Sequence, residues 1–262
     1  DNIYSTAQIV EADKDMLDVT ALKEVRQVLN TLRPDVVINT AAYTNVDKCE
    51  TEMDLAFKVN ALGAKNLAIA CEEIGAKLVH ISSDYVFRGD RQTPYREYDI
   101  PNPINVYGKM KYLGEQYVRE FCSKYFIFRT SWLYGLGGQN FVKTIIKAAS
   151  EKEHLDVVDD QIGSPTNAQD LTYHIFEIAL TTDYGVYHCT GNGQCSWFEF
   201  AKRIIEYGKI DCSISPIKSE KLKQIAKRPS YSVLDNLMLR CTIKDGMRNW
   251  EDALQVFINE VI

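Results

Sequence analysis

The chain has 262 residues, of which 45% are hydrophobic, and a formal net charge of −6. This length and hydrophobic content are typical of one large globular domain or of two coupled domains with a sizeable core. The acidic balance argues against a nucleic-acid-binding surface, and no apolar run reaches the ~18 residues that a membrane span needs.

Seven cysteines are scattered along the chain and include no Cys-x-x-Cys pair. Most are flanked by apolar residues, which predicts reduced, buried side chains in a cytoplasmic protein. Cys189, Cys195 and His188 could be regarded as a metal cluster, but a strand end followed by a turn is the simpler interpretation, and we predict no metal site. The chain begins at Asp1, without a methionine or a signal-peptide pattern.

The first half alternates short apolar runs with amphipathic segments. The predicted helices cover residues 20–34, 54–75 and 105–122. The predicted strands cover residues 35–42, 76–87 and 124–135. Near-continuous apolar strands that alternate with helices indicate an α/β fold, a Rossmann-like doubly wound parallel sheet with helices on both faces.

The second half contains shorter elements of mixed type. Its predicted helices cover residues 140–153, 170–182, 195–209 and 249–262, and its predicted strands cover 155–160 and 184–191. We predict a dinucleotide-binding domain over residues 1–132 and a smaller, mainly substrate-binding α+β domain over 133–262. The helix at 170–182 is expected to return to the first domain.

Polar and aromatic residues follow three of the predicted strands. Ligands of such sheets bind beyond the carboxyl ends of the strands, which lie along one edge. Small residues there let a flat ligand approach the backbone, while hydroxyls and aromatic rings supply polar and stacking contacts. The residues are Ala41, Ala42, Tyr43 and Thr44 after the first strand, Ser83, Asp84 and Tyr85 after the second, and Ser131 and Trp132 after the third.

Tyr107 precedes Lys111 by four positions inside the predicted helix at 105–122. Residues with this spacing share a helix face, so the phenol and the ammonium can point to the same site. A chain with 15 tyrosines contains about one Tyr-x-x-x-Lys by chance, so the pair alone carries little weight. An ordinary exposed helix is the alternative interpretation.

Ser83 gives the pair a chemical context. A tyrosine with a pKa of ~10 is a poor acid–base catalyst near neutrality, and a nearby lysine charge is expected to lower that pKa. Ser83 could hold a substrate carbonyl oxygen beside Tyr107. The three residues predict protonation of the alkoxide formed when a hydride reaches a ketone, and the hydride must come from a cofactor because no side chain donates one.

The chain resembles the dTDP-4-dehydrorhamnose reductases, extended short-chain dehydrogenases of the rhamnose pathway, from about residue 9 to residue 262. The motifs that carry the resemblance are DVVINTAAYTNVDKCE, HISSDYVFRG, PINVYGKMKYLGE, FRTSWLYG, QNFVKT, DQIGSPT and KRPSYSVLDN.

The resemblance implies reduction of the C4 ketone of dTDP-4-dehydro-6-deoxy-L-mannose to dTDP-L-rhamnose with NADPH or NADH. Tyr107 and Lys111 match the catalytic pair of the family, and Ser83 stands where the family usually has threonine. Dimers are common in the family, sometimes with Mg²⁺ at the contact, so a homodimer is expected on resemblance alone.

The resemblance also implies binding residues. Asp18 and Val19 match the pair that meets the adenine, Trp132 matches the aromatic residue near the sugar, and Arg228 is a candidate partner of the pyrophosphate. The full cofactor set is Asp18, Val19, Ala41, Ala42, Tyr43, Thr44, Tyr107 and Lys111. The full substrate set is Val46, Ser83, Asp84, Trp132, Asn140, Gln161 and Arg228.

One feature of the family is absent from the sequence. The family begins with a strand and a Gly-x-x-Gly-x-x-Gly turn, whose backbone amides hold the pyrophosphate. Here the first glycines are Gly63 and Gly75. We therefore expect the 262 residues to be an excerpt of a longer protein, with the segment that discriminates NADPH from NADH lying upstream.

Two alternatives stay open at this point. One is another nucleotide-sugar enzyme, an epimerase or a dehydratase, although dehydratases of this superfamily typically carry Asp-Glu where this chain has Asp84 and Tyr85. The other is a non-catalytic, dinucleotide-binding regulatory subunit of the methionine adenosyltransferase type. Intact Ser83, Tyr107 and Lys111 do not exclude it.

Overall fold

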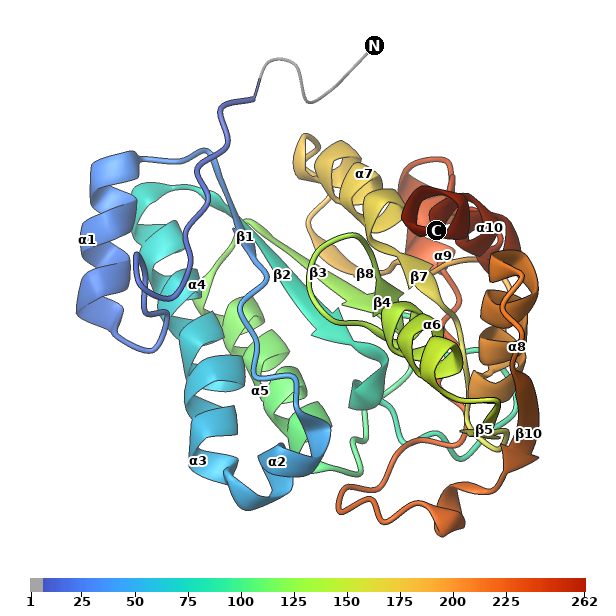
Figure 1. The fold of residues 1–262 in the computed structure, drawn as a ribbon. Coiled ribbons are helices and arrows are strands. Elements are labelled where there is room, and N and C mark those ends of the chain that lie inside the picture. Colours follow the sequence, from blue (N-terminus) through green and yellow to red (C-terminus); the bar gives the residue numbers. More distant parts are fainter. Residues whose placement is uncertain (1–6) are drawn as a thin grey trace.

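A computed structural model describes residues 7–262 and has a parallel sheet at its centre (Figure 1). Its strands are β1 (Val36–Asn39), β2 (Lys77–Ser83), β3 (Tyr125–Thr130) and β8 (Gly185–His188), in the order β1-β2-β3-β8. Every neighbouring pair in this sheet is parallel. The predicted Rossmann-like α/β class is therefore confirmed.

Helices cover both faces of this sheet, which explains why Phe126, Ile127 and Phe128 follow one another in β3. Along β3, Ile127 packs with α1 (Leu22–Leu32), α4 (Gly63–Ile74) and α5 (Val106–Phe121) on one face. Phe126 and Phe128 pack with α7 (Ala168–Ala179) and α9 (Leu237–Thr242) on the other. The polar residues gather toward the carboxyl ends of the strands, where Arg129 and Thr130 end β3 and Ser82 and Ser83 end β2.

The predicted helix at 54–75 consists of three consecutive pieces. These are α3 (Met53–Ala56), a π-helical segment at Phe57–Leu62, and α4. A further short helix, α2 (Val46–Thr51), precedes them and is capped by Asn45, whose side chain accepts from the Lys48 amide at 3.0 Å. The π-helical segment buries Asn60 toward the end of β1, and segments of this kind are frequent at functional sites.

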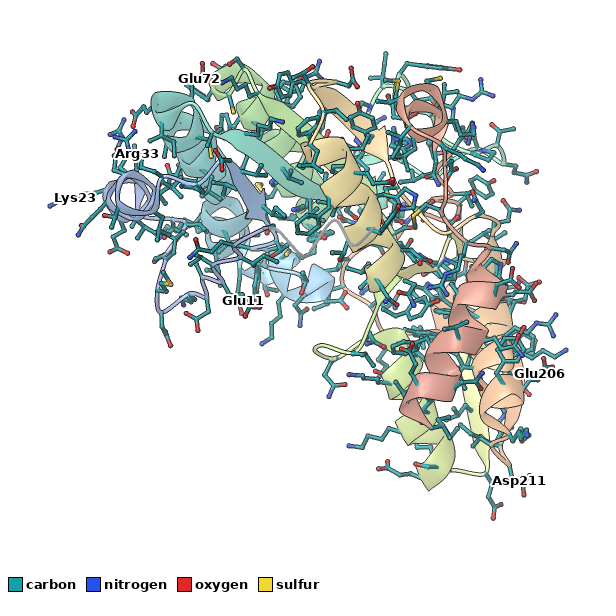
Figure 2. The ribbon with its side chains drawn as sticks, turned by 90° about the horizontal axis from the view of Figure 1, so that it is seen from above. Glu11, Lys23, Arg33, Glu72, Glu206 and Asp211 are labelled. Carbon is teal, nitrogen blue, oxygen red and sulfur yellow. The ribbon has the colours of Figure 1, made fainter. Side chains whose placement is uncertain are left out.

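A second lobe is formed by α6 (Phe141–Glu151), α8 (Trp197–Gly208) and α10 (Trp250–Val261) around a shared apolar cluster. A parallel pair, β5 (His154–Val158) and β10 (Ser213–Ile217), completes it. Figure 2 shows Lys23 and Arg33 at the end of the sheet lobe, with Glu206 and Asp211 at the far end of the second lobe.

Short strand pairs connect the lobes. The first pairs β4 (Leu133–Tyr134) with β7 (Thr166–Asn167), and the second pairs β6 (Ile162–Gly163) with β9 (Cys195–Ser196). Both β8 and α7 come from the chain after residue 133, yet β8 pairs with β3 and α7 packs on the central sheet. The division into domains at residue 133 stays a prediction.

Candidate active site

The turn after β2 and the first turn of α5 meet at the carboxyl edge of the sheet. Ser83 ends β2, and its Oγ accepts a hydrogen bond from the Tyr85 amide at 3.1 Å. A Cβ on Gly108 would lie 2.1 Å from the Tyr85 carbonyl oxygen, so only glycine permits this approach. The rings of Tyr85 and Tyr107 are 5.8 Å apart, edge to face. The structure thereby places Tyr107 beside Ser83.

The environment of Tyr107 favours its protonated form. Burial and the Asp84 carboxylate raise the pKa of the phenol above its usual range, and an interaction with the Ser83 hydroxyl opposes that rise. The direction is opposite to the lowering that we expected from the Lys111 spacing. Because the phenolate would be buried beside a carboxylate, the proton stays on Tyr107 at neutral pH.

Lys111 is buried on the same face of α5. Its Nζ donates to the Ile81 carbonyl at 2.5 Å, and burial lowers the pKa of its ammonium to about 8, against the influence of Glu115. Glu115, one turn further along, accepts from Ser82 Oγ at 2.5 Å and pairs with Arg129 Nη2 at 2.7 Å. The carboxylate of Glu115, although paired with Arg129, therefore favours the charged form of the Lys111 ammonium.

Two segments at the edge of the sheet are fixed by asparagine side chains. Asn60 accepts from the Tyr43 amide at 2.7 Å and donates to the Tyr43 carbonyl at 3.0 Å. Asn66 donates to the Val19 carbonyl at 2.9 Å, and the Asp18 carboxylate accepts from the Thr20 amide at 2.9 Å. That second bond lowers the pKa of Asp18.

These residues fit a nicotinamide dinucleotide. Ala41 and Ala42 present small side chains on a backbone held in place, and Ala41 is exposed. The Lys111 ammonium has three N–H donors, of which the Ile81 carbonyl takes one among the described residues, so it can reach a sugar hydroxyl. The cofactor roles of Asp18, Val19, Ala41 to Thr44, Tyr107 and Lys111 stay predictions that this geometry permits.

Trp132 lies in a rigid aromatic stack. Its backbone is in the left-handed region with φ 47°, and its ring lies 3.5 Å from that of Trp197 at an interplanar angle of 7°. A Cβ on Gly163 would come within 2.4 Å of the Trp132 indole. Trp197 was not singled out from the sequence as a site residue, because it lies in a predicted helix among other apolar residues. The stack fixes the indole that we expect to meet the sugar.

Arg228 forms a bidentate ion pair with Asp47, the residue after Val46. Its Nη2 and Nη1 donate to the two carboxylate oxygens at 2.7 and 3.1 Å, and the amides of Ile225 and Ala226 donate to the same carboxylate at 2.9 Å. The guanidinium and these amides lower the pKa of Asp47 to about 2. Arg228 is thus held by α2, and its predicted contact with a pyrophosphate stays a prediction.

Asn140 and Gln161 have more local surroundings. Asn140 caps α6, accepting from the Lys143 amide at 3.1 Å and donating to the Gly135 carbonyl at 2.8 Å. Gln161 is buried in the turn between β5 and β6. The structure thus gives the Asn140 amide a structural role, and substrate contacts of both residues stay predictions.

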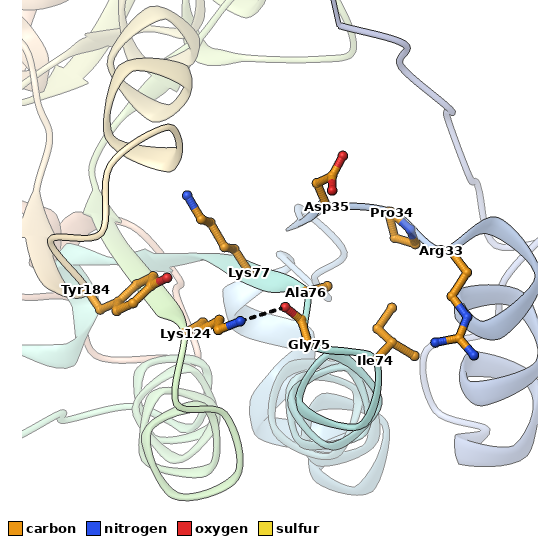
Figure 3. Close-up of a pocket in the computed structure, with 9 residues that line it drawn as sticks. All are labelled: Arg33, Pro34, Asp35, Ile74, Gly75, Ala76, Lys77, Lys124 and Tyr184. Atoms are coloured by element: carbon orange, nitrogen blue, oxygen red, sulfur yellow. Dashed lines mark hydrogen bonds between the residues drawn. The ribbon is translucent and has the colours of Figure 1, made fainter.

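A cavity of about 270 Å³ lies at the opposite edge of the sheet (Figure 3). Asp35, Lys77, Lys124 and Tyr184 line it, each at or just before the start of a strand. The ammonium groups of both lysines form hydrogen bonds within the protein: Lys77 donates to the Ala179 carbonyl at 2.8 Å and Lys124 to the Gly75 carbonyl at 3.1 Å. This cavity is therefore separate from the carboxyl-edge site.

Within residues 7–262, no group of three or more His, Cys, Asp or Glu side chains is arranged to hold a metal ion. All seven cysteines are free thiols. The Nδ1 of His188 forms a hydrogen bond with the Tyr95 carbonyl at 3.1 Å. The described helices include none that is both long and apolar enough to cross a membrane.

Comparisons with known proteins agree with this geometry. The family model for the RmlD substrate binding domain matches residues 3–262. The chain is 42% identical over 255 residues to a dTDP-4-dehydrorhamnose reductase of Salmonella typhimurium, covering 93% of this chain and 85% of that protein. It is 40% identical over 255 residues to the spore coat polysaccharide biosynthesis protein SpsK of Bacillus subtilis, covering 97% of this chain and 89% of that protein.

Among solved structures, the dTDP-4-dehydrorhamnose reductase of Bacillus anthracis in complex with NADP superposes with a TM-score of 0.95 at 49% identity, covering 96% of this chain and 90% of that one. The corresponding protein of Clostridium acetobutylicum gives a TM-score of 0.97 at 43% identity, covering 98% and 92%. Identity at this level over nearly the whole chain shows more than a shared fold, and the chain belongs to the dTDP-4-dehydrorhamnose reductase family.

Proposed function

We propose that this protein reduces the C4 ketone of dTDP-4-dehydro-6-deoxy-L-mannose to give dTDP-L-rhamnose. Its family consists of NAD(P)H-dependent oxidoreductases, and it is one of them. The observation that carries the proposal is the meeting of Ser83, Tyr107 and Lys111 at the carboxyl edge of the sheet. The relatives named for this substrate supply the identity of the sugar nucleotide.

Tyr107 supplies the proton in this mechanism. Because the pKa of its phenol is raised, Tyr107 is protonated at neutral pH and gives up its proton only as negative charge develops on the substrate oxygen. The nicotinamide cofactor, when bound, supplies the hydride. Ser83 holds the carbonyl oxygen beside the phenol, and its hydroxyl serves in place of the threonine usual in the family.

Lys111 positions the reacting groups. With a pKa of about 8 its ammonium is mostly charged at neutral pH, and a buried cation favours negative charge forming nearby. The Ile81 carbonyl fixes the end of the side chain at 2.5 Å. The donors that remain are available to a cofactor hydroxyl.

The Trp132–Trp197 stack and the Arg228–Asp47 pair serve the substrate. A rigid indole face suits the apolar face of a deoxysugar, and a guanidinium suits the oxygens of a diphosphate. In this proposal the deoxysugar packs on the indole stack and the diphosphate meets the guanidinium of Arg228.

Cofactor oxidation by the full-length gene product tests the proposal. The assay supplies NADPH or NADH and the keto-sugar nucleotide generated in place, and NMR identifies the product. Oxidation that depends on the sugar nucleotide and yields dTDP-L-rhamnose is the expected result. Cofactor binding without oxidation would overturn the proposal and favour a regulatory role, whereas oxidation only with another keto-sugar would reassign the substrate.

A further inference from the structure

His80 and Asn39 form a buried polar pair next to the segment 40–44 that follows β1. They are direct partners in the parallel pairing of β1 with β2, so their side chains project to the same face of the sheet. Asn39 Nδ2 lies 3.0 Å from His80 Nδ1, and the two residues are 5% and 1% exposed. The mechanism described above gives neither side chain a role.

The backbone fixes the orientation of the Asn39 amide. Its Oδ1 lies 3.1 Å from the Ala41 amide nitrogen, and a backbone N–H only donates, so the atom that faces it is the oxygen. The amide nitrogen of Asn39 therefore faces His80 and donates to its Nδ1. Turning the amide over would place two N–H groups face to face at Ala41.

This contact decides which nitrogen of His80 carries the proton. Because Nδ1 accepts, a neutral ring has its proton on Nε2. Nε2 has no hydrogen-bond partner among the described atoms and lies toward α5, where a Cβ on Gly114 would be 3.5 Å away, so no bond on that side favours the other tautomer. Burial lowers the pKa of His80 well below its ordinary value of 6.5, and the Lys111 ammonium on α5 lowers it further, so the ring is neutral.

The pair fastens one end of the candidate cofactor segment. Asn39 holds Ala41, and Asn60 holds Tyr43 through hydrogen bonds of 2.7 and 3.0 Å, so the backbone between the two asparagines is fixed at both ends. Without an acceptor at His80, the buried Nδ2 of Asn39 would lose its partner. An unpaired buried amide is costly, so the side chain would gain by turning away from Ala41.

We propose that His80 is a positioning residue for the nicotinamide cofactor, because its Nδ1 holds the Asn39 amide on Ala41 and thereby shapes the segment 41–43 that receives the dinucleotide. The inference rests on the proposed function, since it needs the cofactor to lie on these residues. His80 acts through Asn39 and touches neither the cofactor nor the reacting atoms.

The tautomer of His80 can be tested in the wild-type protein. Two-bond ¹⁵N–¹H NMR of the full-length gene product distinguishes the two ring nitrogens, and the signals that disappear in His80→Asn identify the ring. A neutral ring with its proton on Nε2 is expected between about pH 5.5 and pH 8, with and without NADPH. A proton on Nδ1, or a charged ring in this range, would overturn the inference.

His80→Leu tests the role in binding, because leucine offers no acceptor to Asn39. The dissociation constant of NADPH, measured by fluorescence titration, should rise at least about tenfold, while kcat at saturating cofactor and the KM for the sugar nucleotide stay within about twofold of wild type. His80→Asn should recover most of the affinity, since its Oδ1 is as far from Cβ along the side chain as Nδ1 and can accept from Asn39.

A double-mutant cycle identifies the link itself. Asn39→Ala should weaken NADPH binding about as much as His80→Leu, and the two changes together should weaken it little further, because both remove the same connection to Ala41. The matched control is His174→Leu on α7. His174 is 2% exposed and its Nε2 accepts from the Gly246 amide at 3.1 Å, so this variant should lose thermal stability but bind NADPH as wild type does.

Three results would contradict the role of His80. They are wild-type affinity in His80→Leu, additive losses in the cycle, and an equal loss of affinity in His174→Leu, which would indicate a general effect of removing a buried histidine. Affinity in His80→Asn as low as in His80→Leu would also count against it. A wild-type enzyme that binds NADPH but leaves the keto-sugar unreduced would instead sink the proposed function, so the two failures are distinguishable.

Discussion

The chemistry of the site depends on single residues whose protonation is set by burial. Tyr107 and Asp84 are both shifted toward their protonated forms, while burial shifts Lys111 toward its neutral form. A reductase needs a group that retains a proton until charge develops on the substrate oxygen, and a buried phenol beside a carboxylate meets this need.

Tyr107→Phe should lower kcat by about 10²–10⁴-fold, because the ring keeps its packing against Tyr85 but loses the transferable proton. The thermal midpoint and the affinity for the cofactor should stay close to wild type. Steady-state kinetics, calorimetry and cofactor titration check the three quantities. A variant that retains most of the wild-type rate would show that another group supplies the proton.

Asp84→Asn should stabilise the fold at high pH. The folded-state pKa of about 6 exceeds the ordinary value of 3.8, so the native state holds more protons between these values and its stability falls as the pH rises through them. Removing the carboxylate should raise the free energy of unfolding by about 3 kcal/mol at pH 8 and by little at pH 4. Urea unfolding at both values measures this, and an equal change at the two would refute the assignment.

At the scale of elements, α5 and the π-helical segment form the base of the site. A Cβ on Gly114 would lie 2.4 Å from the Asn60 carbonyl oxygen, so the helix and the segment touch through backbone atoms. Asn60 fixes Tyr43 with its side chain, and Lys111 lies one turn before Gly114. Both sides of the candidate cofactor site therefore depend on this one contact.

Gly114→Ala should destabilise the fold by about 1–3 kcal/mol, because the added methyl group must push α5 away from Asn60. Lys111 would move with the helix, so kcat should fall as well. Gly137→Ala is the control, since nothing lies within 4 Å of its added Cβ and its φ is not positive. Equal melting temperatures for the two variants would show that the contact is not tight.

Elements with a long hydrophobic periodicity or a continuous apolar run could be predicted from the sequence. The central strands and the helices from α1 to α10 that exceed ten residues were all anticipated. The short helices α2 and α9 were not, because six residues make fewer than two helical turns, and the strand β10 was not, because it contains Pro216. Gly108 and Gly114 looked unfavourable for a helix, and only the structure shows the close contacts that require them.

Only part of the candidate site could be predicted from the sequence. Tyr107 and Lys111 could be paired from their helical spacing, and Ser83 could be added because it follows a predicted central strand and matches a family motif. Asp47, Ser232 and Trp197 could not, because their partners lie far along the chain and the contacts exist only after folding. The direction of the Tyr107 pKa shift was wrong for a related reason, since spacing does not reveal how deeply a side chain is buried.

At the scale of the whole molecule, the candidate site is closed by links between distant segments. Asp47 joins α2 to Arg228, Asn105 donates to the Lys227 carbonyl at 2.8 Å, and Ser230 donates to the Gly89 carbonyl at 2.8 Å. The segment 225–230 is thereby tied to the sheet lobe at three points. Loosening one link should affect substrate binding before it affects the fold.

Asp47→Asn should raise the KM for the sugar nucleotide about tenfold or more with kcat nearly unchanged, because Arg228 and its loop lose their anchor. The lowered pKa of about 2 keeps Asp47 ionised above about pH 4, so the difference from wild type should be constant between about pH 5 and pH 9. Asp54→Asn, an exposed change on α3, is the control. A rise in KM that varies with pH in that range would contradict the assignment.

The stacked indoles of Trp132 and Trp197 also provide an intrinsic spectroscopic signal. Parallel rings 3.5 Å apart couple their electronic transitions, so the pair should give a two-signed band in circular dichroism that neither ring gives alone. Trp250, the remaining tryptophan, belongs to the same apolar cluster and packs edge to face on Phe200, whose ring also lies next to the stacked pair. Any ligand that tilts Trp132 would change the split band without a dye or a label, so occupancy of the proposed sugar site could be followed by circular dichroism alone.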